Sequence, residues 1–348
     1  MKRDLMSRLV GGGAVAALAL GVLAGGALAQ TQLTVYTALE AEELEPLRQA
    51  FVAEHPDIDI NWVRDSTGII TARILAEIEA GDPKADVFLG TSATSLLVVD
   101  QKGMLLPYAP NGLENLDPRF RDSRNPPHWV GVDAYAAAIC FNTIEAEKNG
   151  LPKPSSWQDL LDPVYLDHLV MPNPNSSGTG FLTVSAWLQM MGEKQAWDYM
   201  DQLHQNMARY THSGSKPCRL AAAGEVPIGI SFAFRGARLK QQGAPLDIIV
   251  PEEGIGWEVE ASGILKTSKK IEAAKKLIDW HISPAAMKVF NEYLPILAIP
   301  GIAKPVEHFP AGIEDAMINN DFDWAAKNRS RILSEWQSRY DSKSEPKG

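Results

Sequence analysis

The sequence has little cysteine and lacks the short motifs that mark zinc sites. Its 348 residues include only two cysteines, and they contain no C-x-x-C pair, no Cys/His zinc spacing and no H-E-x-x-H. Zinc ligands in proteins usually occur in such closely spaced sets. The sequence therefore does not favour a structural zinc site or a zinc protease, and we expect neither a bound metal nor a cofactor.

A nucleophile elbow of the type G-x-S-x-G is also absent. The best remaining candidate for hydrolysis is His212 beside Ser213 and Ser215. A nucleophilic serine needs a base within reach and a third group to orient that base, and neighbours in sequence do not face each other in this way. We expect a protein that is not an enzyme, with a secreted hydrolase as the less favoured alternative.

Basic residues are too few to suggest a nucleic-acid partner. The chain has 33 Lys and Arg against 43 Asp and Glu, which gives a formal net charge of −10. A protein that binds nucleic acid usually presents a basic surface. We therefore expect a small-molecule ligand and no nucleic acid.

Long apolar runs are confined to the first 29 residues. Basic residues at 2, 3 and 8 precede an apolar stretch at 10–26, and A-L-A follows at 27–29. This order is typical of a secretory signal peptide with an A-x-A cleavage site. A membrane anchor is the alternative, but the stretch is short of the roughly 20 apolar residues that a spanning helix needs. We predict cleavage after residue 29 and a periplasmic mature chain, whose net charge is −12.

The two cysteines that remain are Cys140 and Cys218. An even pair in an oxidising compartment is compatible with one disulfide. Two buried free thiols are equally compatible with the sequence, because spacing does not place the two Cβ atoms.

The mature chain alternates strand and helix patterns. Strand-like runs at 33–39, 58–66 and 85–90 are separated by helical apolar spacing, and the same order begins again after residue 143. This predicts an α/β fold of two lobes with mostly parallel sheets flanked by helices. We expect lobe 1 to comprise 30–139 and 260–305, lobe 2 to comprise 140–259, and 306–348 to be a C-terminal helical segment whose last residues are disordered. Strands near 135–142 and 256–264 would cross between the lobes, and the ligand would bind in the cleft.

Small hydroxyl residues and glycines gather where strands lead into helices. The segment "NSSGTGF" places Ser177, Gly178 and Thr179 at the start of a helix. Helix N-termini carry free N–H groups and partial positive charge, and nearby hydroxyls add donors, so such a turn can hold an oxyanion. A simple helix cap is the alternative for any one turn. Four further junctions have this composition: Tyr36–Thr37, Ser66–Thr67–Gly68, Thr91–Ser92–Thr94 and Thr211–Ser213–Gly214–Ser215.

Acidic and aromatic residues lie close to the expected crossings. They are Asp133 and Tyr135 in one segment, and Trp257, Glu258 and Glu260 in the other. A carboxylate and an aromatic face together can bind an ammonium group. For each acid, a surface ion pair is the alternative to a ligand contact. The same two roles are open for Arg64 and Arg235.

Long blocks of the chain resemble the 2-aminoethylphosphonate-binding periplasmic proteins of ABC importers. They include "VYTALEAEEL", "WVRDSTGIITARILAE", "NPPHWVGVDAYAAAICFNT", "MPNPNSSGTGFLTVSAWLQ" and "NDFDWAAKNRSRILSEW", and the resemblance covers roughly residues 32–345. It implies the type II periplasmic binding protein fold of the ferric-binding-protein group. It also implies capture of 2-aminoethylphosphonate by hinge closure and its delivery to a membrane permease. We expect a monomer.

The turns and the resemblance together give the expected ligand residues. For the phosphonate these are Tyr36, Thr37, Ser66, Thr67, Thr91, Ser177, Gly178, Thr179 and Ser215. For the amine they are Glu260, Asp133 and Trp257.

Ferric iron and inorganic phosphate are the alternative cargoes. Iron-binding members of the wider group carry adjacent tyrosines on the strand that here reads "GISFAFRG", with Ser231, Phe232 and Phe234. Ferric iron prefers hard oxygen ligands such as phenolates. Their absence from this strand argues against iron.

Overall fold

The computed structural model describes residues 30–346. The predicted signal peptide lies outside the described residues, as do residues 347 and 348. Within residues 30–346, no helix is both long and apolar enough to cross a membrane.

Nine strands form the sheet structure, in the order β2-β1-β3-β9-β4-β7-β5-β6, with β8 paired to β4. The parallel pairs are β1–β2, β1–β3, β5–β6 and β5–β7, while every pair that involves β4 or β9 is antiparallel. The strands are β1 (Thr31–Thr37), β2 (Ile58–Arg64), β3 (Val87–Ser92), β4 (Val130–Asn142), β5 (Leu169–Pro172), β6 (Met207–Thr211), β7 (Ile228–Phe232), β8 (Leu246–Ile249) and β9 (Trp257–Ile264).

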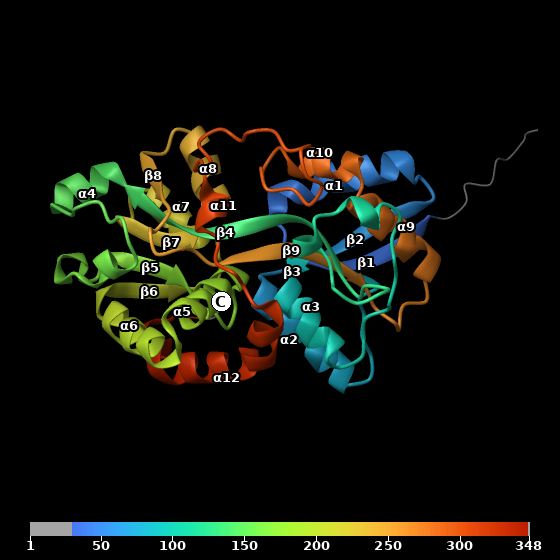
Figure 1. Ribbon diagram of the computed structural model, residues 1–348, viewed down its shortest axis with the longest axis horizontal. Coiled ribbons are helices and arrows are strands. Elements are labelled where there is room, and N and C mark those ends of the chain that lie inside the picture. The colour runs from blue at the N-terminus through green and yellow to red at the C-terminus, as the bar shows by residue number, and fades with distance from the viewer. Residues whose placement is uncertain (1–29, 347–348) are drawn as a thin grey trace, which may run out of the picture.

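Strand β4 belongs to both halves of the molecule. Its first part, residues 130–136, pairs with β9, and residues 137–142 pair with β7 and β8. Figure 1 shows β4 and β9 running through the centre, with β1–β3 on one side and β5–β8 on the other. The crossing predicted near 135–142 thus corresponds to the middle of β4. The exact lobe boundaries stay a prediction.

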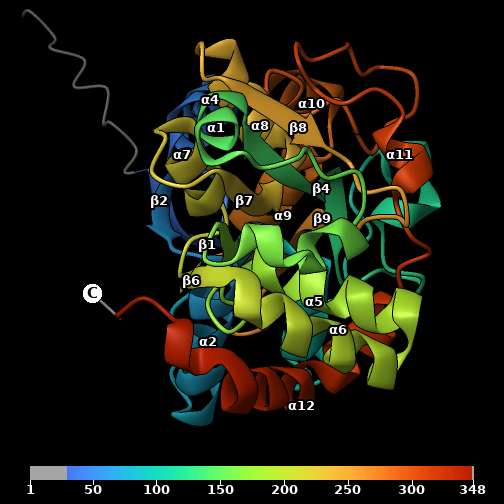
Figure 2. The ribbon, with the colours of Figure 1, turned by 90° about the vertical axis from the view of Figure 1, so that its left-hand side faces the viewer.

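Helices cover the sheets on both sides (Figures 1 and 2). The helices around β1–β3 are α1 (Ala41–Glu54), α2 (Thr67–Glu79), α3 (Ala93–Asp100), α9 (Ile271–His281) and α10 (Pro284–Phe290). Those around β5–β8 are α4 (Thr143–Asn149), α5 (Gly178–Met191), α6 (Glu193–Asn206), α7 (Lys216–Ala222) and α8 (Ala233–Gln241). The C-terminal helices are α11 (Ile313–Ala316) and α12 (Phe322–Tyr340). Short 3-10 turns lie at 113–115, 118–120, 158–161, 163–165 and 341–343.

Burial follows from the sequence pattern of each element. All six residues of β3 are buried, as expected for a central strand covered on both faces. Helix α2 buries Ile70 and Ile74 four residues apart, on the same face as Thr67 and Thr71. The period-3.6 pattern of the sequence therefore fixes which side of α2 packs on the sheet.

The end of one strand differs from the sequence expectation. Strand β7 ends at Phe232, so Phe234 belongs to α8 rather than to the strand. The last described residues are also held in place: Ser344 pairs with Tyr210, and the Glu345 carboxylate accepts from the His212 backbone N–H over 2.7 Å. Residues 344 and 345 thus contact β6 and the turn after it, and the disorder expected for the last residues stays a prediction.

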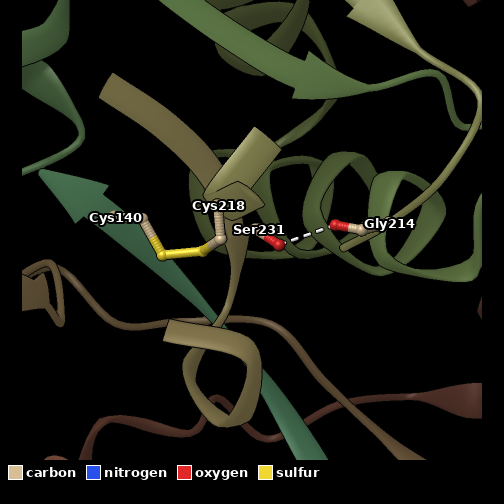
Figure 3. Close-up of a disulfide and its surroundings, with 4 residues drawn as sticks. All are labelled: Cys140, Gly214, Cys218 and Ser231. Carbon is tan, nitrogen blue, oxygen red and sulfur yellow. Dashed lines mark hydrogen bonds between the residues drawn. A yellow bond between two sulfur atoms is a disulfide. The ribbon is translucent and has the colours of Figure 1, made fainter. Parts of the chain in front are cut away.

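Cys140 and Cys218 form a disulfide between β4 and α7 (Figure 3). Their Cα atoms are 5.3 Å apart, and both residues are fully buried. Of the two states that the sequence left open, the structure has the bridge.

Candidate functional site

A cavity lies between the two halves of the molecule, where the turns after β1, β2, β3 and β5 meet. The centres of water molecules can occupy about 50 Å³ of it, which suits a compact ligand. Its lining is formed by Ala38, Glu40, Glu43, Arg64, Ser66, Thr67, Gly90, Thr91, Ser92, Tyr135, Ser177, Gly178, Thr179, Ser213, Gly214, Phe232, Phe234 and Glu260.

Two helices begin at this cavity from opposite sides. Ser66 is the N-cap of α2, and Ser177 is the N-cap of α5. The Ser177 hydroxyl oxygen accepts a hydrogen bond from the Gly180 N–H over 3.2 Å, which is ordinary capping geometry. The Gly68 N–H is bonded to the Ser176 carbonyl oxygen, whereas the N–H groups of Thr67, Gly178 and Thr179 have no acceptor within residues 30–346. Both helix ends therefore keep free donors and partial positive charge at the cavity.

Several hydroxyl groups at this end have no partner. Within residues 30–346, the side chains of Ser66, Thr67 and Thr179 make no hydrogen bond to the protein, although all three line the cavity. The Thr91 hydroxyl is buried and also lacks a partner among the described residues. A buried polar group normally has a hydrogen-bond partner. This set of hydroxyls can therefore hold an anion with several donors.

The N-termini of α2 and α5 are in direct contact beside the cavity. A Cβ atom on Gly178 would lie 2.6 Å from the Thr67 hydroxyl oxygen and 3.2 Å from the Tyr135 hydroxyl oxygen. Only a residue without a side chain permits this approach. The structure is therefore closed around the cavity.

The disulfide stabilises another turn at the cavity, the one at Ser213 and Gly214 that leads into α7. Gly214 lies in the turn that leads into α7, and its carbonyl oxygen accepts from the Ser231 hydroxyl over 2.6 Å (Figure 3). Cys218 lies one helical turn further on and is joined to β4. The bridge and this hydrogen bond together fix Ser213 and Gly214 against the sheet.

Three carboxyl groups gather on the other side of the cavity. Glu43 and Glu260 line it, and Asp133 lies behind them with no exposed surface. Burial raises the pKa of all three, and each is raised further by the charge of a neighbour within the group. This side of the cavity can hold a cation.

A fourth acid, Glu40, is neutralised by arginines. Its carboxylate lies 3.0 Å from Arg235, 3.1 Å from Arg219 and 3.7 Å from Arg64. Arg219 is on α7 and Arg235 on α8, whereas Glu40 caps α1. These ion pairs connect the two halves at the cavity wall.

A buried charge lies beneath the cavity. Arg329 of α12 is buried, with its guanidinium carbon 4.3 Å from the ring centre of Phe181. Burial lowers the pKa of Arg329 to about 10 and raises that of Glu258 to about 7. Glu258 pairs across the strands with Tyr135, whose pKa is raised by burial, so its phenol stays protonated and can donate to a ligand.

The structure brings together seven of the predicted ligand residues. They are Ser66, Thr67, Thr91, Ser177, Gly178, Thr179 and Glu260, all of which line the cavity. Asp133 does not line the cavity and lies beside Glu260, which does.

Besides Asp133, four predicted ligand residues do not line the cavity. The Tyr36 hydroxyl donates to Glu77 over 2.6 Å, because side chains alternate along β1 and this one points into the core. The Thr37 hydroxyl oxygen accepts from the Leu39 N–H over 3.2 Å and braces the turn. The Ser215 hydroxyl lies 3.1 Å from that of Ser213, and Trp257 donates from Nε1 to the Ile318 carbonyl over 2.8 Å.

Glu40 and Glu43 are site residues that the sequence analysis missed. The segment "LEAEEL" has the composition of a solvated first helical turn. A signal was nevertheless present, because E-x-x-E is a variant of the capping box that fixes the N3 side chain against the N-cap backbone. In this structure the capping box holds the Glu43 side chain in a buried position at the cavity.

His212 is not arranged for catalysis. Its Nδ1 lies 3.4 Å from the Ser176 hydroxyl, and its Nε2 is buried without a partner among the described residues. Neither Ser213 nor Ser215 is bonded to it within residues 30–346. The same residues contain no group of three His, Cys, Asp or Glu side chains that could hold a metal ion.

Residues 82–328 match the sequence profile of the family described as bacterial extracellular solute-binding protein. The chain belongs to this family. An uncharacterized protein of Haemophilus influenzae is 31% identical over 332 residues, which are 92% of this chain and 94% of that protein. A probable ABC transporter periplasmic-binding protein of Sinorhizobium fredii, y4fP, is 24% identical over 86% of this chain and 83% of its own length.

The fold is that of a type II periplasmic binding protein. It matches the periplasmic binding protein AfuA of Actinobacillus pleuropneumoniae, solved with exogenous fructose-6-phosphate, with a TM-score of 0.83 and 28% identity. The match covers 90% of this chain and 99% of AfuA. The predicted fold class is confirmed, and the chain is an extracytoplasmic solute-binding protein of the ABC-importer type. AfuA is a periplasmic binding protein, and y4fP is described as a probable one.

Proposed function

We propose that the chain captures 2-aminoethylphosphonate in the cavity and delivers it to the permease of an ABC importer. One observation carries this proposal: hydroxyls on one side of the cavity, and one carboxyl oxygen each of Glu43 and Glu260 on the other, have no hydrogen-bond partner within residues 30–346. A phosphonate oxyanion matches the first set, and an ammonium group matches the second.

The charge balance of the cavity favours a zwitterion over a plain oxyanion. Among the described residues that line the cavity, Arg64 is the one cation, and it pairs with Glu40. Glu43 and Glu260 have no counter-ion within residues 30–346. An inorganic phosphate would add negative charge beside carboxylates that have no counter-ion. An amine on the same ligand offsets them.

A sugar phosphate is the second candidate, because AfuA was solved with fructose-6-phosphate. Sugar hydroxyls can donate hydrogen bonds to carboxylates, and the phosphate would use the same hydroxyl turns. Ferric iron is less favoured, since Tyr135 is the single phenol among the lining residues.

Binding would proceed by hinge closure. The separated lobes admit the ligand, and the N-termini of α2 and α5 bind its phosphonate from opposite sides. Contacts to both lobes stabilise the closed state, which the permease would recognise. Export by the predicted signal peptide would place the monomeric chain in the periplasm.

The test is calorimetric titration of the mature, ligand-stripped chain with 2-aminoethylphosphonate, ethylphosphonate, inorganic phosphate, fructose-6-phosphate and ferric citrate. Tight one-to-one binding of the aminophosphonate alone supports the proposal. Binding of phosphate, sugar phosphate or iron instead would identify that ligand as the cargo and overturn the aminophosphonate proposal.

Two variants test the oxyanion side. Thr179→Ala and Ser66→Ala should each weaken binding about 10-fold or more, because a hydrogen bond to a charged group contributes about 1.5–3 kcal/mol. Ser338→Ala, an exposed serine of α12, is the control. Unchanged affinity in both site variants would exclude this anion site.

A further inference from the structure

Glu43, Asp133 and Glu260 come from three separate elements and meet inside the protein. Glu43 lies in the first turn of α1, Asp133 on β4 and Glu260 on β9. Glu43 is 1% exposed and Asp133 is fully buried. Burying three acids together is costly unless something compensates their charge.

The hydrogen bonds of these acids are incomplete. The Glu43 carboxylate accepts from the Glu40 N–H over 2.7 Å through Oε2, and its Oε1 has no partner in the part of the chain that the structure describes. Both Asp133 oxygens and Glu260 Oε2 are also buried without a donor among residues 30–346. Asp133 and Glu260 are within hydrogen-bonding reach of each other, and two carboxyl groups can bond only if one of them carries a proton.

No cation of the described chain compensates this cluster. Arg235, which is on α8, pairs with Glu40 and Glu42 at 3.0 and 2.7 Å. Arg64 pairs with Glu40. Within residues 30–346, no lysine, arginine or histidine nitrogen lies within 4.0 Å of the Glu43, Asp133 or Glu260 carboxyl groups.

We propose that Glu43 is a specificity-determining residue, which together with Glu260 binds a primary ammonium group of the ligand, while Asp133 positions Glu260. This inference rests on the proposed function and names the residue that selects an aminoalkyl oxyanion. Glu43 and Glu260 both line the cavity, and each has a buried carboxyl oxygen without a donor among residues 30–346. An ammonium carries three N–H donors on a compact charge. A ligand that ends in a methyl group leaves both oxygens unpaired.

Proton release from the Asp133–Glu260 pair on ligand binding is a second measurable consequence of this proposal. We expect one carboxyl group of the pair to carry a proton in the empty protein. Burial raises the pKa of both groups, the charge of Glu43 raises that of Asp133 further, and the charge of Asp133 raises that of Glu260 further. Entry of the ammonium supplies the missing positive charge, and the proton leaves to solvent. The other groups facing the cluster are Glu40 and Glu42 of α1, Arg235 of α8, Tyr135 of β4, Glu258 of β9 and Tyr293.

The experiment compares 2-aminoethylphosphonate with ethylphosphonate on Glu43→Gln. Glutamine keeps the volume and can still accept from the Glu40 N–H. We expect the affinity for the aminophosphonate to fall at least about 10-fold, while that for ethylphosphonate changes less than about 3-fold. Glu260→Gln should do the same, which keeps the test decisive if one variant folds poorly. Glu45→Gln, an exposed acid on the same helix, is the control.

Proton release is measured by titrating at pH 7 in two buffers with different ionisation enthalpies. The unmodified chain should release close to one proton when it binds the aminophosphonate, and Asp133→Asn should release markedly less. Equal losses for both ligands in Glu43→Gln, or no proton release from the unmodified chain, would overturn this inference. Failure of the unmodified chain to bind 2-aminoethylphosphonate would instead overturn the proposed function.

Discussion

The Gly68 backbone N–H donates a hydrogen bond to the Ser176 carbonyl oxygen over 2.9 Å. Gly68 lies in the first turn of α2, and Ser176 immediately precedes the N-cap of α5. The two helices that begin at the cavity therefore touch through their backbones. This contact closes one wall of the site, and it exists only while the two lobes are together.

Gly68→Ala should weaken ligand binding without weakening the fold. A Cβ atom there would lie 2.2 Å from the Asn175 carbonyl oxygen, so the lobes could not close fully. Alanine favours a helix over glycine by about 1 kcal/mol, so the ligand-free chain should keep its melting temperature. We expect at least a 10-fold loss of affinity, on the order of 1.4 kcal/mol, by calorimetry. Ile69→Ala on the same turn is the control, and wild-type affinity in Gly68→Ala would show that the bound form does not close here.

Glu40→Gln should speed ligand release. Glu40 pairs with Arg219 and Arg235 across the cavity wall, and Arg235 is buried. Truncating one partner of a buried ion pair acts mainly on dissociation. We expect a dissociation rate about 10-fold higher in stopped-flow measurements, with a smaller change in the association rate. If association slows and dissociation does not change, these ion pairs do not hold the closed state.

Replacing both Cys140 and Cys218 with serine should destabilise the chain. The bridge joins residues 78 apart, and a loop of that size predicts a loss on the order of 4 kcal/mol in the free energy of unfolding. The turn at Ser213 and Gly214 should also become looser, with weaker ligand binding. Urea unfolding measures the first effect. A reducing agent should destabilise the unmodified chain and leave the double variant unchanged; the opposite pattern would contradict the role of the bridge.

His281 should make stability depend on pH. Burial lowers the pKa of His281 to about 3, and neither ring nitrogen has a partner within residues 30–346. The unfolded chain therefore binds a proton that the folded chain does not, from about pH 6.5 downward. Stability is fully present above that pH and falls by about 1.4 kcal/mol per unit as the pH drops toward 3.

His281→Leu tests this dependence, since leucine keeps an apolar contact with Phe290. Urea unfolding at pH 7.5, 5.5 and 4.5 should give a shallower loss of stability for the variant than for the unmodified chain. Parallel curves would assign the acid sensitivity to other groups.

Local sequence pattern predicted much of the fold. The alternation of strands and helices, the class of the fold and the crossing near residue 135 could all be read from apolar periodicity. The hydroxyl turns at Ser66 and Ser177 were also visible, because capping chemistry is local. The position of Phe234 was missed, since a short apolar strand that runs directly into a helix shows no break in its pattern.

The carboxyl side of the site was harder to predict. The sequence pattern around Glu43 is typical of an exposed acid, although Glu43 lines the cavity. Trp257 was predicted to contact an ammonium group, but its Nε1 donates to the Ile318 carbonyl instead. The direction of a side chain depends on which neighbours pack against it, and local sequence does not contain those neighbours.

The sequence by itself determined the secondary structure, the composition of the turns and the absence of motifs for zinc or serine chemistry. Those properties depend on residues within a few positions of one another. Only the tertiary structure decided that Cys140 meets Cys218, and that Glu43, Asp133 and Glu260 share one buried space opposite the hydroxyl turns. These meetings join residues 78 to 217 positions apart, and chain topology, rather than local preference, brings such distant segments together.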